Sequence, residues 1–261
     1  MGAGTRPLRA QIDLNADLGE GFADAELMPF LTSCNVACGA HAGDAATMRA
    51  TVRLALHHGV AIGAHPSFPD REGFGRRVIT RDPAAIEKLV AEQIARLAVI
   101  AAAEGATLTH VKPHGALYNL AAVDERIALA IARAVQAVEP PALLFALAGS
   151  RGLEVARARG IEPVAEGFVD RGYQPDRTLA PRGEPGALIE DPETAAARAL
   201  ALVERGVVRA VDGGEITLEV DTLCLHGDTP RAREIAERVA TALRTAGIVL
   251  APPAPRALTR P

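Results

Sequence analysis

Short apolar runs alternate along the chain with longer segments in which apolar residues recur at helical spacing. The runs are rich in Val, Ile, Leu or Ala and are bounded by Gly, Pro or polar residues, which is typical of parallel strands covered by helices. They span residues 12–18, 34–38, 60–64, 108–111, 143–148, 163–168 and 218–225. The pattern therefore predicts a strand–helix unit that is repeated about seven times.

The intervening segments carry helix signals at their ends. Apolar residues between positions 86 and 100 recur every three or four residues and would form one helix face. A capping side chain precedes a proline at Asp82, Asp191 and Thr229, which predicts that helices begin there. Glycine, which readily adopts the left-handed conformation that ends a helix, follows helical patterns at Gly59, Gly105, Gly160 and Gly247.

The repeated unit is compatible with a closed barrel or with an open, doubly wound sheet. No linker or change of composition divides the chain, so we expect one domain over residues 1–261, with its core at about 11–250. Polar residues follow at least five of the predicted strands, whereas an open sheet gathers them at one switch point. We therefore predict an α/β fold, an irregular (β/α) barrel with about seven parallel strands.

Polar side chains near the predicted strand ends are the candidates for chemistry. Because residues two apart share a face of a strand, several sets should point the same way. These sets are Asp13, Asn15 and Asp17; His110, Lys112 and His114; Glu166 and Asp170; His226 and Asp228; and His41 and His65 close two further strands. Each residue alone could be a turn cap or a satisfied core residue, but in a barrel the set would converge on one mouth.

Two Gly- and Pro-containing loops extend this picture. Residues 66–80 include Arg76, and residues 170–186 include Arg171 and Arg182. Arginine binds carboxylates and phosphates through its planar fork, so the loops could act as lids or anion clamps; a solvated surface loop is the alternative.

Composition excludes several classes of function. The net charge of −4, the absence of Trp and the 3% aromatic content argue against nucleic acid as the main partner. Three cysteines suggest no disulfide framework, and Cys34 and Cys38 fit buried apolar positions better than a zinc site. We expect neither a signal peptide at residues 1–10 nor a membrane span, and hence a cytoplasmic protein.

Familiar phosphate and nucleophile motifs are absent. The sequence has no G-x-x-x-x-G-K-[ST] loop, no G-x-G-x-x-G fingerprint and no G-x-S-x-G elbow. If ATP is used, this chain must hold it in an unusual way or share it with partner proteins.

Several longer motifs together resemble the LamB/YcsF family, whose members are known as the A subunit of 5-oxoprolinase. They are DLNADLGE (13–20), NVACGAHAGD (35–44), GAHPSFPD (63–70), GFGRR (73–77), VKPHGALYN (111–119), FVDRGY (168–173) and CLHGD (224–228). The resemblance covers about residues 12–247. Ala16 and Phe68 depart mildly from the family pattern, which usually has Cys or a similar small residue and Tyr there.

The resemblance implies a seven-stranded (β/α) barrel related to sugar deacetylases that bind a metal through Asp and His. It implies that 5-oxoproline, ATP and water give glutamate, ADP and phosphate, with Mg²⁺ accompanying ATP. It also implies two further proteins, the B and C subunits. A bound divalent metal is an open possibility, with Asp13, His41 and His65 as candidate ligands.

Taken together, the residues and the resemblance give a set of expected roles. The expected catalytic residues are Asp13, Asp17, His41, His65, Lys112, His114 and His226. The expected substrate-binding residues are Asn15, Glu20, Arg76, Glu166, Asp170, Arg171 and Asp228. A histidine could act as general base, carboxylates could orient it or hold a cation, and Lys112 with a loop arginine could bind anionic groups. The sequence leaves the base unassigned. A metal-dependent sugar deacetylase and a non-catalytic substrate-binding subunit remain as alternatives.

Overall fold

A computed structural model of the chain describes residues 10–254, and its centre is a closed barrel of seven parallel strands. The order around the barrel is β1-β2-β3-β4-β5-β6-β9, and β9 pairs with β1 to close it. The bounds are β1 Gln11–Leu18, β2 Ser33–Ala37, β3 Ala61–His65, β4 His110–Val111, β5 Leu143–Leu147, β6 Pro163–Phe168 and β9 Thr222–His226. All seven predicted strands are therefore present, and the predicted barrel is confirmed. A short strand, β10 (Val249–Leu250), pairs with the start of β1.

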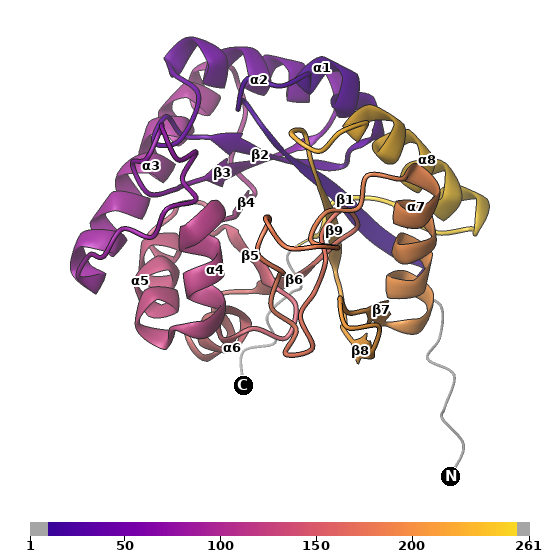
Figure 1. Cartoon of the computed structure of the whole chain (residues 1–261). Coiled ribbons are helices and arrows are strands. Elements are labelled where there is room, and N and C mark those ends of the chain that lie inside the picture. The colour runs from indigo at the N-terminus through magenta and orange to yellow at the C-terminus, as the bar shows by residue number, and fades with distance from the viewer. Residues whose placement is uncertain (1–9, 255–261) are drawn as a thin grey trace.

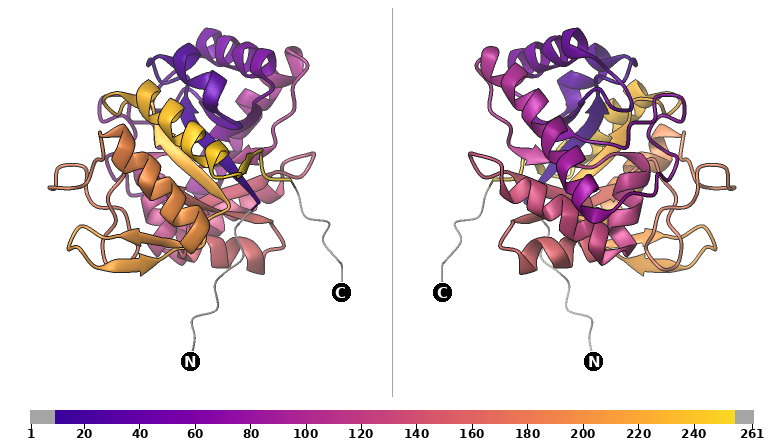
Figure 2. Two further views of the ribbon diagram at one scale, coloured as in Figure 1. Left: turned by 90° about the vertical axis from the view of Figure 1, so that its right-hand side faces the viewer. Right: turned by 90° about the vertical axis from the view of Figure 1, so that its left-hand side faces the viewer.

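Helices surround the barrel on its outside (Figures 1 and 2). Their bounds are α1 Asp24–Leu27, η1 Met28–Phe30, α2 Ala45–His58, α3 Pro83–Ala103, α4 Gly115–Val123, α5 Glu125–Gln136, α6 Arg151–Ala158, α7 Pro192–Leu200, η2 Ala201–Arg205 and α8 Ala232–Thr245. The main hydrophobic core lies where their apolar faces meet the outer faces of the strands. None of these helices, all within residues 10–254, is long and apolar enough to cross a membrane.

Two of the three predicted helix starts are confirmed. Asp82 accepts a hydrogen bond from the Ala84 N–H, and Asp191 accepts one from the Thr194 N–H. The prediction at Thr229 is wrong, because α8 begins two residues after Pro230 and the Thr229 hydroxyl instead donates to Asp170. This threonine supports a strand-end carboxylate and does not cap a helix.

The segment between α7 and β9 also differs from its prediction. A small antiparallel hairpin, β7 (Val207–Arg209) with β8 (Glu215–Thr217), stands outside the barrel (Figure 1). The run predicted at 218–225 enters the barrel only at Thr222. Leu218 and Val220, which precede the strand, are also buried. The apolar run is therefore longer than the strand, which is why its start was predicted too early.

The barrel interior is filled by inward-pointing side chains, many of them polar. Gly63 on β3 makes room for the ring of His110 on β4, because an added Cβ would lie 2.2 Å from that ring. A small apolar cluster of Leu143, Phe145 and Val164 fills one side of the interior. The three cysteines are buried and unpaired, as the sequence indicated. The expectation of one domain extends to residues 1–9 and 255–261, which lie outside the described residues.

Candidate active site

A cavity of about 370 Å³ opens at the carboxyl ends of the barrel strands. Strand ends contribute acids, imidazoles and an amine to its wall, α4 contributes Tyr118, and the two predicted loops contribute arginines. The polar lining includes Asp17, His65, Arg76, Lys112, His114, Tyr118, Arg171, Arg182 and His226. The structure therefore brings most of the predicted site residues together, from segments far apart in the sequence.

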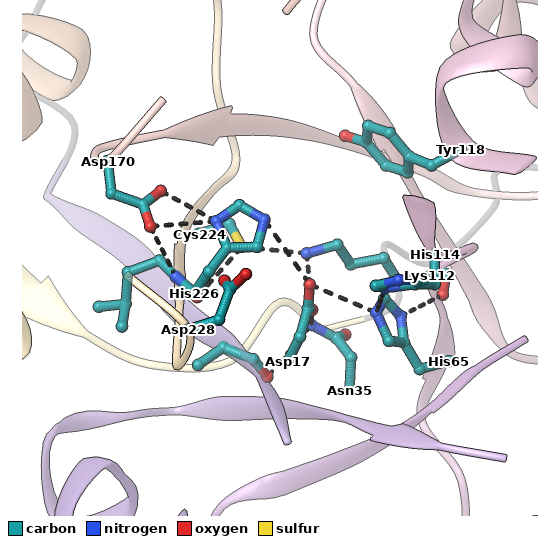
Figure 3. Close-up of polar contacts among 12 residues, drawn as sticks. Asp17, Asn35, His65, Lys112, His114, Tyr118, Asp170, Cys224, His226 and Asp228 are labelled. Carbon is teal, nitrogen blue, oxygen red and sulfur yellow. Dashed lines mark hydrogen bonds and ion pairs between the residues drawn. The ribbon is translucent and has the colours of Figure 1, made fainter. Parts of the chain in front are cut away.

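Lys112 lies at the centre of the buried charges below the cavity. Its ammonium group is 2.9 Å from Asp17 Oδ1 and 3.0 Å from Cys224 Sγ (Figure 3). It is also 2.9 Å from Glu166 Oε1. Burial alone would lower the pKa of Lys112, but Asp17, Cys224 and Glu166 hold it well above its usual range. Because these groups already occupy its three protons, Lys112 is best suited to fixing the two carboxylates.

Asp17 is the carboxylate that joins the two sides of the site. Its Oδ2 atom lies 3.3 Å from His65 Nε2 and 3.8 Å from His226 Nε2. Burial raises the pKa of a carboxyl, but His65 and Lys112 outweigh it and hold the pKa of Asp17 well below its usual range. Asp17 is therefore an anion that can accept a hydrogen bond from, or orient, groups on both sides.

His226 and Asp170 form a carboxylate–imidazole pair at one side of the cavity. Asp170 Oδ2 lies 3.0 Å from His226 Nδ1 and also accepts from the His226 N–H and the Thr229 hydroxyl. Burial would raise the pKa of Asp170, but the interactions with His226 and Thr229 lower it to about 2. The pair leaves His226 Nε2 directed toward Asp17, at the cavity wall (Figure 3). This is the arrangement in which a carboxylate orients a general base.

A second group of polar residues lies on the opposite side, and we call it the histidine cluster. It consists of Glu20, His41, His65 and His114. Their ring nitrogens and a carboxylate oxygen all lie within 4.8 Å of one another. The rings of His41 and His114 are stacked with centroids 3.9 Å apart.

His41, His114 and Glu20 of the histidine cluster resist taking up charge. Burial and the neighbouring His65 lower the pKa of His41 to about 3, and burial with His41 and His65 lowers the pKa of His114 well below its usual value. Burial, with Asp17 and Asp228, raises the pKa of Glu20 well above its usual value. Burial therefore favours the uncharged forms of Glu20, His41 and His114.

The two loops meet above the cavity at Asp228. This carboxylate forms ion pairs with Arg76 from the first loop and with Arg182 from the second. Burial lowers the pKa of Arg171 to about 10, and its guanidinium donates to the Ala180 and Ala187 carbonyls. The loops therefore place three arginines at the mouth, with Asp228 joining two of them.

Three predicted site residues, and the strand-end candidate His110, lie elsewhere. Asp13 stands on the amino-terminal half of β1, so the prediction that it lies at the mouth is wrong. It accepts hydrogen bonds from the hydroxyls of Thr32, Ser33 and Thr222. Four residues of extended strand, about 13 Å, separate it from Asp17. The suggested metal trio of Asp13, His41 and His65 therefore does not form.

Asn15, Glu166 and His110 also lie below the cavity. Asn15 donates to Glu166 and to Thr222, and Glu166 accepts from the Tyr118 hydroxyl at 2.7 Å. The His110 ring lies 2.9 Å from Asn35 Oδ1. These side chains support the residues above them and do not line the cavity.

Sequence reasoning missed three residues that belong to the site. Asn35 donates to Asp17 at 2.9 Å, Cys224 contacts Lys112, and the Tyr118 hydroxyl reaches Glu166 at the cavity wall. A signal existed for Tyr118, because it is one of only two tyrosines and follows His114 by one helical turn. No local pattern marked the other two, since their partners come from different strands.

Two groups within the described residues could hold a metal ion. The histidine cluster offers three imidazoles and a carboxylate, and Asp17, Cys224 and His226 form a smaller group. Imidazole and carboxylate donors suit Zn²⁺ and similar ions. The side-chain ammonium group of Lys112 lies 3.0 Å from the Cys224 sulfur and 2.9 Å from Asp17. It therefore already supplies the positive charge in the group of Asp17, Cys224 and His226.

Comparisons with known proteins agree with this architecture. The sequence pattern of the LamB/YcsF family matches residues 12–257. The chain is 50% identical over 246 residues to the 5-oxoprolinase A subunit of Heliobacterium modesticaldum, covering 92% of this chain and 97% of that protein. It is 53% identical over 246 residues to the 5-oxoprolinase A subunit of Methylococcus capsulatus, covering 92% and 95%.

A solved structure has the same fold. The lactam utilization protein of Thermus thermophilus superimposes with a TM-score of 0.86 at 46% sequence identity, covering 92% of this chain and 99% of that one. The family pattern, the relatives and the barrel all span nearly the whole chain. The protein described here is thus a member of the LamB/YcsF family.

Proposed function

We propose that this chain is the A subunit of an ATP-dependent 5-oxoprolinase and that it opens the lactam ring of 5-oxoproline. The names of relatives about half identical to it support this assignment. The observation that carries it is the Asp170–His226 pair, which directs an imidazole nitrogen into a cavity of suitable size for a small cyclic amide.

The ring opening needs an activated water and a proton for the departing nitrogen. His226, oriented by Asp170, takes a proton from the attacking water through Nε2 and returns it to the ring nitrogen as the C–N bond breaks. Asp17 lies 3.8 Å from that nitrogen and stabilises the imidazolium that forms. The arginines at the mouth bind the substrate carboxylate.

ATP makes this reaction favourable by activating the carbonyl. An amide carbon is a poor electrophile, and transfer of the γ-phosphoryl group to the lactam oxygen, with release of ADP, makes it a good one. One water then opens the ring and a second displaces phosphate, so that glutamate, ADP and phosphate result. The sequence contains no phosphate loop. We therefore assign the phosphoryl transfer to the complex with the B and C subunits. Mg²⁺ would accompany the ATP, and the complex would work in the cytoplasm.

Reconstitution tests the proposal. This chain is mixed with the B and C subunits encoded by the same organism, and glutamate release from 5-oxoproline is followed with and without ATP. We expect release only when all three proteins and ATP are present. The His226→Gln variant should assemble with its partners but release glutamate about 10²- to 10⁴-fold more slowly. His57→Gln, on the exposed end of α2, should behave as wild type.

Two outcomes would favour the alternatives. Glutamate release by the B and C subunits without this chain would make it a non-catalytic component. The histidine cluster favours a second candidate, a metal-dependent deacetylase-like hydrolase. Turnover of an N-acetyl sugar that requires a bound metal and no ATP would support that activity and remove the first proposal.

A further inference from the structure

The histidine cluster contains an arrangement of nitrogen atoms that the proposed reaction does not use. His65 Nδ1 lies 2.7 Å from the Lys112 carbonyl oxygen, and His114 Nε2 lies 2.8 Å from the Phe74 carbonyl oxygen. A carbonyl oxygen can only accept, so both of these ring nitrogens carry a hydrogen. In a neutral imidazole the other nitrogen then carries only a lone pair.

Those two other nitrogens face each other. His65 Nε2 and His114 Nδ1 are 3.0 Å apart, which is hydrogen-bonding distance, and when both rings are neutral neither atom has a hydrogen to donate. Glu20 Oε1, a third acceptor when ionised, lies 3.3 Å from His114 Nδ1 and 3.7 Å from His65 Nε2. Asp17 Oδ2 also lies 3.3 Å from His65 Nε2. With the rings neutral and Glu20 ionised, the lone pairs of these atoms converge, as they do around a bound cation.

His41, the fourth member of the histidine cluster, lies in the loop that follows β2. His41 Nε2 lies 2.8 Å from Glu20 Oε1, and its other nitrogen, Nδ1, is buried without a hydrogen-bond partner. The four residues come from the carboxyl ends of β1, β2, β3 and β4, which are neighbours in the barrel. Four of the six separations between the ligand atoms are 2.8 to 3.7 Å, and all six are within 4.8 Å. The four bracket the separation of about 3.3 Å between ligand atoms of a tetrahedral zinc ion with bonds of 2.0–2.1 Å.

We propose that the histidine cluster binds one divalent transition-metal ion, with Zn²⁺ as the best fit. Three imidazole nitrogens and a carboxylate oxygen suit Zn²⁺, whereas Mg²⁺ and Ca²⁺ prefer all-oxygen sites. The backbone carbonyls that receive the N–H groups of His65 and His114 are typical outer partners of metal-bound histidines. Because both of these rings line the cavity, the ion would polarise a carbonyl or activate a water there.

The surrounding backbone holds the rings in place before any ion enters. Gly75, at a φ of 66°, packs so tightly that an added Cβ would lie 2.8 Å from His114 Cδ2 and 3.0 Å from His41 Cβ. A rigid cluster of this kind favours binding, because little side-chain entropy is lost when the ion enters. This inference does not depend on lactam hydrolysis.

Metal binding itself is the test. The full chain is stripped with a chelator and titrated with ZnCl₂ in a calorimeter, and its metal content is measured after dialysis. We expect about one Zn²⁺ per chain and, with CoCl₂ in place of zinc, the strong visible absorption of a low-symmetry cobalt site. His114→Gln and Glu20→Gln should each weaken zinc binding by about 100-fold or more. Loss of a residue that only hydrogen-bonds to a metal ligand typically weakens binding by about 10- to 100-fold, and loss of a ligand itself should cost at least as much.

The matched control removes histidines that lie elsewhere. His57 and His58 are exposed neighbours at the end of α2, so the double variant H57Q/H58Q should bind zinc as wild type does. Circular dichroism confirms that each variant is folded. The proposal is overturned if the folded wild type binds no zinc. That result is expected if His65 and His114 share a proton between their facing nitrogens, so that no cation is needed there. It is also overturned if H57Q/H58Q abolishes binding and His114→Gln does not. Since the measurement is metal binding, a negative result leaves the proposed reaction untouched.

Discussion

The barrel interior holds two layers of buried polar residues that differ in how their hydrogen-bonding capacity is used. The lower layer consists of Asp13, Asn15, Ser33 and Thr222, and the upper layer consists of Asp17, His65 and Lys112, with the half-buried His226 at its edge. In the lower layer, Asp13 is matched by three hydroxyl donors and Asn15 by Glu166 and Thr222. In the upper layer, acidic and basic side chains face one another and a cavity.

The difference separates support from chemistry among residues of the same types. A buried carboxyl group surrounded by hydroxyls helps to specify the barrel, because its hydrogen bonds offset part of the cost of its desolvation. A buried imidazole whose free nitrogen points at a cavity keeps capacity for a substrate, proton or ion. Substitutions in the lower layer should therefore change mainly stability, and substitutions in the upper layer should change activity.

Lys112→Met should have the largest effect. It leaves Asp17 and Glu166 as buried carboxylates without their cation, which typically costs about 3–5 kcal/mol of unfolding free energy. Urea denaturation measures the loss, and glutamate release by the reconstituted complex should disappear. Lys88→Met, at an exposed pair with Glu92, is the control and should change stability by less than about 1 kcal/mol. Equal stability of both variants would show that the upper-layer charges are not coupled.

His226→Gln should lower kcat for glutamate release by about 10²- to 10⁴-fold, the range typical of a lost general base. Asp170→Asn should lower it similarly, because Asp170 acts by orienting His226. The double variant should be little worse than His226→Gln alone, since residues that act as a unit are not additive. Additive losses in kcat would separate the two residues and contradict the proposed pair.

Thr222→Val probes the lower layer. The hydroxyl donates to Asp13 and accepts from Asn15, so its loss should cost about 2–3 kcal/mol, as for hydrogen bonds that involve a charged group. Chemical denaturation measures this cost, while kcat/KM should stay at the wild-type value. A large fall in kcat/KM in a fully folded variant would mean that the lower layer takes part in the reaction.

Asp13→Asn should produce the smallest effect, visible in the pH dependence of stability. Burial, partly offset by Thr222, Thr32 and Ser33, raises the pKa of Asp13 from 3.8 to about 6. A raised pKa means that the folded state binds the proton more tightly, so this group's stabilisation is present below pH 4 and is lost as the pH rises through 6.

Denaturation curves at pH 4 and pH 7 measure the effect of that substitution. The difference between wild type and Asp13→Asn should change by about 2 kcal/mol over this interval, with the wild type relatively more stable at pH 4. Ser33→Ala removes one hydrogen-bond donor to Asp13, so stability should depend on pH more steeply in this variant than in the wild type. A flat difference would show that Asp13 keeps an ordinary pKa.

The sequence by itself determined the barrel and most of the inventory of the site. Apolar runs bounded by turn residues located all seven barrel strands, because a strand covered by helices must be apolar on its outer face. Strand alternation also placed Asp17, Lys112 and His226 on inward faces, and the convergence of parallel strand ends predicted that they would meet.

Tertiary structure alone decided the height of each residue in the barrel and its partners. Alternation says that Asp13, Asn15 and Asp17 share a face, but not which of them reaches the mouth, since that depends on the register with β2 and β9. The pairing of Asp170 with His226 and of His65 with His114 joins residues 56 and 49 positions apart. Such contacts arise from closure of the barrel, which brings together atoms whose separation along the chain carries no information about their distance.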